Sequence, residues 1–136
     1  MKAVLLEVGE PADTFAALVA AARAAGHRVG WLDFHCSPEA PGELEAAVAA
    51  GALRAVAAGS EGTLALKAVR GVPVLRDLLR EHFRGCRLVL VAGTVGAPRL
   101  EPHGDGWSVV ADAAVRRRSL TTDELVKRLS RARPFD

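Results

Sequence analysis

Three side chains that can bind a metal or act as a nucleophile or base stand within four positions, at Asp33, His35 and Cys36. A carboxylate, an imidazole and a thiolate are common zinc ligands, and a thiol beside an imidazole is typical of cysteine nucleophiles. Side chains alternate along a strand, so Asp33 and His35 share one side and Cys36 points away. These residues predict a metal site or thiol chemistry, and a strand end without such a role is the alternative.

A second candidate is the loop VGEPADT at positions 8–14, between a predicted strand and a predicted helix, where a P-loop would cradle phosphate. It has one glycine, Gly9, where the motif needs two, and Asp13 stands where the phosphate-binding lysine would be. Thr14 keeps a hydroxyl that could reach a magnesium ion. By themselves, these residues favour an acid-capped helix start over a phosphate cradle.

A third candidate comes from the uneven charge. Residues 1–60 carry four Lys/Arg against seven Asp/Glu, and residues 61–136 carry fourteen against nine. The basic second half could attract a phosphorylated small ligand through Lys67, Arg70 or Arg99. Aromatic residues do not interleave with these charges, so no base-stacking platform is visible, and we expect no nucleic-acid binding.

The elements that must position these residues are strands alternating with helices, separated by Gly- and Pro-containing turns. The expected strands are 2–8, 27–34, 54–58, 63–68 and 87–91, with one or two more within 100–110. The expected helices are 13–25, 43–50, 72–83 and 122–131. Thr121 and Glu124 form a capping box for the last helix. Residues 54–58 and 63–68 form either a hairpin or a strand with a short extension, and the arginines at 116–118 are expected in a solvated turn.

This order predicts one α/β domain over residues 1–136, a three-layer α/β/α sandwich with a mostly parallel sheet. Ligands of such sheets normally bind beyond the carboxyl ends of the strands. The loops expected at that edge are 7–14, 33–37, 59–62 and 92–96.

The two cysteines, Cys36 and Cys86, form neither a disulfide framework nor a zinc-finger pattern, and we expect Cys86 to be structural. The start of the chain does not resemble a signal peptide, and no stretch approaches the ~18 apolar residues of a membrane span. We therefore expect a cytoplasmic protein that does not enter a membrane.

The order of the segments is similar to that of the molybdopterin-guanine dinucleotide biosynthesis protein B family, small P-loop proteins. The pieces that carry the resemblance extend over most of the chain. They are AGHRV at 25–29, AGA at 50–52, LRDLLREHFRGCRLVLVAG at 75–93, PRLE at 98–101, and the closing helix at 120–129.

The resemblance implies a P-loop NTPase-like fold, a homodimer, and GTP with magnesium or a molybdopterin as ligand. It places the nucleotide site at Gly9, Asp13, Thr14, Gly93 and Thr94, and it implies a molybdenum-cofactor enzyme or biosynthesis protein as partner.

Three charged positions of the family pattern differ in this chain. The P-loop lysine falls at Asp13, the strand-two lysine falls near Asp33, and the acidic residue of the family's Val-Glu-Gly falls at Ala92. An aspartate in place of the lysine repels phosphate, so GTP hydrolysis is not expected. The resemblance thus implies a non-catalytic accessory or adaptor. The alternatives are a metal- or thiol-dependent enzyme and a binder of phosphorylated ligands.

Overall fold

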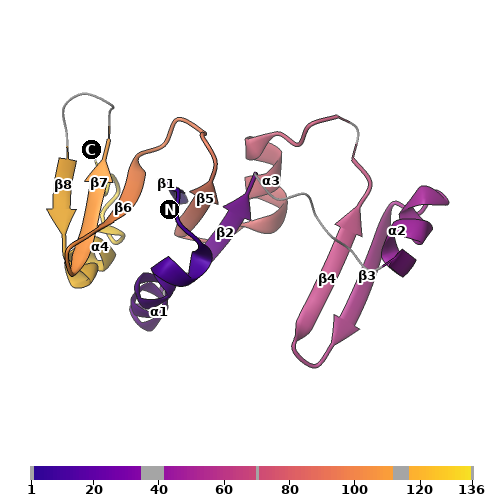
Figure 1. Ribbon diagram of the computed structural model, residues 1–136, viewed down its shortest axis with the longest axis horizontal. Helices are drawn as coiled ribbons and strands as arrows, with labels where there is room; N and C mark the ends of the chain where they lie inside the picture. The colour runs from indigo at the N-terminus through magenta and orange to yellow at the C-terminus, as the bar shows by residue number, and fades with distance from the viewer. Residues whose placement is uncertain (1, 35–41, 70, 112–116, 136) are drawn as a thin grey trace. The chain divides into compact units, whose positions relative to one another are not determined.

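The computed structural model describes residues 2–34, 42–69, 71–111 and 117–135 (Figure 1). Contacts divide the chain into two compact units, Met1–His35 with Leu79–Asp136, and Cys36–Leu78. That residues 1–136 form one domain remains a prediction. Within the described ranges, no helix is long and apolar enough to cross a membrane.

The larger unit contains a six-stranded sheet in the order β2-β5-β1-β6-β7-β8. β2, β5, β1 and β6 are parallel neighbours, whereas β7 and β8 are antiparallel additions at one side. The α/β class and the mostly parallel sheet are therefore confirmed. The strands are β1 (Val4–Val8), β2 (Val29–Asp33), β5 (Leu88–Ala92), β6 (Arg99–His103), β7 (Gly106–Val110) and β8 (Arg117–Leu120).

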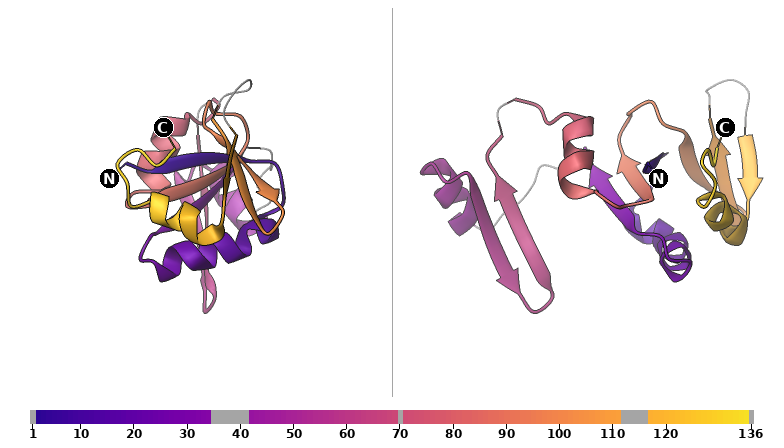
Figure 2. Two further views of the ribbon diagram at one scale, coloured as in Figure 1. Left: turned by 90° about the vertical axis from the view of Figure 1, so that its left-hand side faces the viewer. Right: turned by 180° about the vertical axis from the view of Figure 1, so that it is seen from behind.

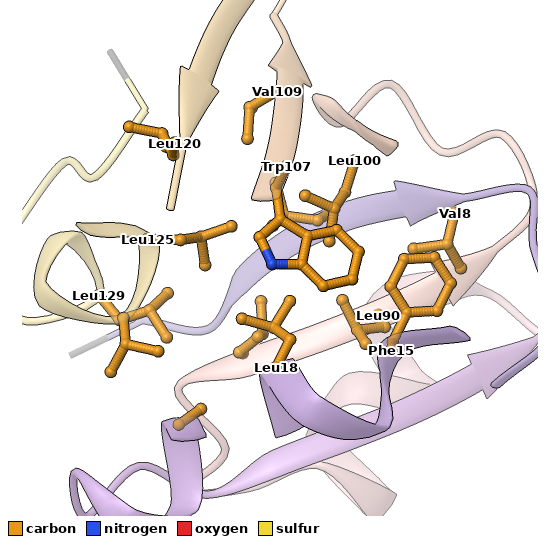
Figure 3. Close-up of a cluster of buried hydrophobic side chains, with 14 of the residues drawn as sticks. Val8, Phe15, Leu18, Leu90, Leu100, Trp107, Val109, Leu120, Leu125 and Leu129 are labelled. Atoms are coloured by element: carbon orange, nitrogen blue, oxygen red, sulfur yellow. The ribbon is translucent and has the colours of Figure 1, made fainter. Parts of the chain in front are cut away.

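One face of this sheet packs against η1 (Ala12–Phe15), α1 (Ala16–Ala24) and α4 (Thr122–Arg128), and together they enclose the main core (Figures 2 and 3). Phe15 stacks on Trp107 with ring centroids 5.5 Å apart. Leu18 and Leu125 are fully buried between the helices and the sheet. Each such leucine contributes about 1.5–3 kcal/mol through removal of its side chain from water.

The opposite face is covered at β5, which lies between β2 and β1. Val89 and Val91 of β5 are fully buried there. Gly30 of β2 lies so close to Phe83 that an added Cβ would be 2.3 Å from the Phe83 ring. Phe83 directly follows α3 (Leu75–His82), a helix that begins in the smaller unit and ends in the larger one. Burial from both faces explains why β5 is apolar throughout.

The smaller unit is built on an antiparallel hairpin of β3 (Arg54–Gly59) and β4 (Gly62–Lys67), with α2 (Gly42–Ala49) against it. The hairpin alternative of the sequence analysis is confirmed. Among the strands that the structure describes, β3 pairs only with β4, in a sheet of two strands. The strands that flank residues 59–62 thus belong to this separate sheet, so the loop does not follow a strand of the parallel sheet as expected.

Local capping signals are confirmed where they involve near neighbours. Gly26 has a φ of +89° and, together with His27, donates hydrogen bonds that close the end of α1. The Glu124 main-chain N–H donates to Thr121 Oγ1 at 3.1 Å, as the capping box requires. The boundaries differ slightly, because the first helix starts as a 3-10 turn and α4 ends at Arg128 rather than Arg131.

The arginine run is not a turn where it is described. Arg117 and Arg118 belong to β8, an edge strand paired with Val110 and Val109 of β7. Leu120 at the end of this strand is buried in the core, which anchors the strand. An edge strand can accommodate arginines because their long side chains reach solvent.

Candidate functional site

An open pocket of about 410 Å³ lies at the carboxyl ends of β1, β2 and β5, where a parallel sheet normally binds its ligand. We call it the carboxyl-edge pocket. Among the described residues, its lining contains two carboxylates and no lysine or arginine. The lining residues are Val8, Gly9, Glu10, Pro11, Ala12, Trp31, Asp33 and Ala92.

The loop after β1 forms one wall of this pocket. Gly9 and Glu10 line it, whereas Asp13 and Thr14 lie one turn further on, exposed in η1 and outside the lining. Pro11 has no main-chain N–H, and the Thr14 N–H donates back to the Pro11 carbonyl at 3.0 Å. Two of the amides that a phosphate cradle would use are therefore missing or already bonded.

The loop after β5 is held by Glu7, which the sequence analysis did not single out. One carboxylate oxygen of Glu7, Oε2, accepts hydrogen bonds from the main-chain N–H groups of Val95 (2.9 Å) and Ala97 (3.0 Å). Gly93 and Thr94 lie at the start of this loop and do not line the pocket. The sequence did offer one signal for this role, because Glu7 is the single charged residue in the otherwise apolar strand β1.

Gly93 has a packing role in the structure. Its φ is +153°, and an added Cβ would lie 3.2 Å from Phe34. The Phe34 N–H donates to the Ala92 carbonyl at 3.0 Å, so the chain continues beside β5 past the end of β2. A side chain at position 93 would disturb this contact at the rim of the carboxyl-edge pocket.

Arg99 is not one of the residues that line the pocket, although its side chain lies close to the loop after β1. An added Cβ at Gly9 would lie 2.6 Å from the Arg99 guanidinium, which shows that this side chain runs beside the loop. Its Nε lies 3.1 Å from a carboxylate oxygen of Glu101. The Arg99 charge is thus opposed by a carboxylate on the same strand.

The predicted metal or thiol cluster is described only in part. Asp33 lines the carboxyl-edge pocket, whereas His35 and Cys36 lie outside the described residues. No group of three or more His, Cys, Asp or Glu side chains among the described residues could hold a metal ion.

The expected phosphate-binding set Lys67, Arg70 and Arg99 does not fall within one described unit. Lys67 belongs to the smaller unit and Arg99 to the larger one, while Arg70 lies outside the described residues. Trp31 is a pocket residue that the sequence analysis missed. Its ring lies 6.2 Å from that of Phe15, centroid to centroid, so it joins the pocket wall to the core.

Comparison with protein-family models finds no match for this chain, and comparison with curated proteins finds none either.

Proposed function

We propose that this chain is a non-catalytic accessory or adaptor protein on a three-layer, P-loop-like α/β scaffold, with a degenerate nucleotide site at the carboxyl-edge pocket. The observation that carries the proposal is the chemistry of that pocket. Glu10 and Asp33 are its charged lining residues, and Asp13 stands one turn away at the expected lysine position.

The residues present do not fit a phosphate-bearing cofactor in this pocket. GTP and molybdopterin both carry phosphate, which P-loops bind through successive main-chain N–H groups and a lysine. Here Pro11 lacks an N–H, the Thr14 N–H is bonded to Pro11, and the described lining residues include no lysine or arginine. The carboxylate of Glu10 disfavours a second anion nearby. Phosphoryl transfer at this edge is therefore not part of the proposal.

An accessory protein needs a surface for its partner, and the β3–β4 hairpin supports one. Val56 and Leu64 on this hairpin are 57% and 45% exposed. A two-stranded sheet is marginally stable by itself, and unpaired strand edges readily accept another strand. We propose that a second copy of the chain pairs with this hairpin. A molybdenum-cofactor enzyme or biosynthesis protein is the heterologous partner that the family resemblance implies.

The decisive experiment is an NMR titration of the ¹⁵N-labelled chain with Mg·GTP, together with a phosphate-release assay. The proposal expects no GTP hydrolysis and no shift of the amide signals of Gly9, Glu10 and Gly93. Shifts at these amides with a preference for GTP over ATP, or hydrolysis above the buffer rate, would contradict it.

A matched control is the double variant Glu10→Gln and Asp13→Lys, which restores the lysine and removes the pocket carboxylate next to it. If charge is the reason why the parent chain does not bind GTP, this variant gains Mg·GTP-dependent shifts of the amide signals of Gly9 and Gly93. If it gains none while remaining folded, main-chain geometry rather than charge excludes the nucleotide.

A further inference from the structure

Cationic side chains gather at the amino ends of the parallel strands, opposite the carboxyl-edge pocket. Three segments meet there, residues 23–28, 84–87 and 128–133, and none contains an aspartate or glutamate. Arg87 joins them. Its main-chain N–H donates to the first segment at 2.8 Å, and its guanidinium donates to carbonyls of the third segment and of Lys2.

A pocket of about 320 Å³ lies at this edge, lined by Arg23, Gly26, His27, Arg28 and Val29. We call it the amino-edge pocket. Its lining contains no carboxylate, and within the described parts of the chain no acidic side chain pairs with Arg23 or Arg28. Two arginines and a histidine are therefore among the residues that line one concave space.

These cations are not needed to cap α1. A cation at a helix C-terminus often serves the last carbonyls. In α1, the His27 N–H donates to the Ala22 carbonyl at 3.0 Å and the Gly26 N–H donates to the Arg23 carbonyl at 2.9 Å. This pair of bonds is the Schellman arrangement, which satisfies these carbonyls with main-chain donors. The side chains of Arg23, His27 and Arg28 remain available for another anion.

The neighbouring backbone limits where Arg28 can lie. Gly85 has a φ of +82°, and an added Cβ there would be 3.0 Å from Arg28 Nη1. The carbonyl of Arg28 accepts the N–H of Arg87 at 2.8 Å, which fixes its backbone at the start of β5. The guanidinium therefore lies against the turn between α3 and β5.

We propose that the amino-edge pocket binds a compact phosphate-bearing small molecule. The planar guanidinium fork matches two phosphate oxygens at once, and two arginines with an imidazole suit a dianion or a polyphosphate. A nucleic acid fits less well, because the lining has no Phe, Tyr or Trp ring on which a base could stack. This inference goes beyond the proposed function and does not depend on it.

The test is calorimetric titration of the full chain with inorganic pyrophosphate at low ionic strength, with Arg23→Gln, Arg28→Gln and Arg76→Gln as variants. Arg76 is an exposed arginine of α3 whose Nε lies 4.0 Å from Asp77, so its replacement removes the same charge elsewhere. We expect each pocket variant to weaken pyrophosphate binding by about tenfold or more. The Arg76→Gln variant should bind like the parent chain.

A second measurement maps the site, because amide shifts caused by pyrophosphate should concentrate at residues 23–29. The triphosphate of GTP would bind in the same pocket and shift the same amide signals. Binding at the carboxyl-edge pocket would instead shift the signals of Gly9 and Gly93, so the two sites can be distinguished. Three results would overturn the proposal. They are absence of pyrophosphate binding, equal loss in Arg76→Gln, or tighter binding of duplex DNA or RNA than of pyrophosphate through the same arginines.

Discussion

Arg87 Nε donates a 2.6 Å hydrogen bond to the main-chain carbonyl of Leu129, 42 residues further along the chain. Arg87 is 8% exposed at the start of β5, and Leu129 is the C-cap residue of α4. The same guanidinium also donates to the carbonyls of Lys2 and Arg131. One buried cation next to β5 thus joins the segment before β1 to the end of the last helix, and balances the negative end of that helix.

Replacing Arg87 with methionine should lower the free energy of unfolding of the larger unit by about 2–4 kcal/mol. The methionine keeps apolar bulk but leaves the carbonyls of Lys2, Leu129 and Arg131 without this donor. Urea unfolding followed by tryptophan fluorescence measures the change, because Trp31 and Trp107 both lie in this unit. Arg84→Met is the control at an exposed position. Equal effects of the two substitutions would show that Arg87 does not hold α4.

Gly106→Ala should destabilise the larger unit by about 1–3 kcal/mol, because the new methyl group has no room. An added Cβ at Gly106 would lie 2.4 Å from the main-chain oxygen of Leu120, where β7 pairs with β8. Gly59→Ala is the control, since an added Cβ there has no neighbour within 4 Å. Differential scanning calorimetry should show a lowered melting temperature for Gly106→Ala only. An unchanged melting temperature would mean that β8 shifts at little cost to make room for the added methyl group.

Glu7→Ala should expose the amides of Val95 and Ala97 to solvent. Both donate to the Glu7 carboxylate, and loss of a hydrogen bond to a charged group should speed their exchange by about tenfold or more. Hydrogen exchange followed by NMR measures this directly. Glu101→Ala serves for comparison, because the Glu101 carboxylate pairs with Arg99 and not with these amides. If both variants accelerate exchange equally, the loop does not depend on Glu7.

Thr121→Ala should cost about 1 kcal/mol of stability through loss of the N-cap of α4. Thr121 Oγ1 accepts the Glu124 N–H and also lies 3.1 Å from the Glu124 carboxylate. Chemical denaturation checks the value, with exposed Thr94→Ala as the matched substitution. A Thr121→Ser variant, which keeps the hydroxyl, should recover most of the loss. Failure of serine to do so would argue against capping as the cause.

The hairpin proposal predicts a dimer that Val56→Lys dissociates. Val56 is 57% exposed on β3, and a lysine there places charge in the proposed contact. Sedimentation velocity over a range of concentrations measures the state of association. Val72→Lys changes the same residue type outside the hairpin, at an 87% exposed position, and should leave the dimer intact. A parent chain that stays monomeric throughout would refute pairing with a second copy.

The ligand edge was predictable in part. Gly9 and Asp33 were singled out from the sequence, and both line the carboxyl-edge pocket. Asp13, Thr14, Gly93 and Thr94 do not, because the loops turn away after one or two residues. Trp31 was not predicted, since a tryptophan within an apolar strand has the same pattern whether it meets the core or a pocket. Here it does both, contacting Phe15 and lining the pocket.

The sequence by itself determined the features that depend on close neighbours along the chain. These are the alternation of strands and helices up to β7, the Gly26 stop of α1 and the Thr121–Glu124 cap, whereas the hairpin was one of two alternatives and β8 was expected to be a turn. Only the tertiary structure decided that Glu7 holds the loop before Arg99, that Arg87 joins distant segments and that, among the described strands, β3 and β4 form a separate sheet. The reason is that local propensity and capping act within a few residues, whereas these contacts join groups that meet only after the chain has folded.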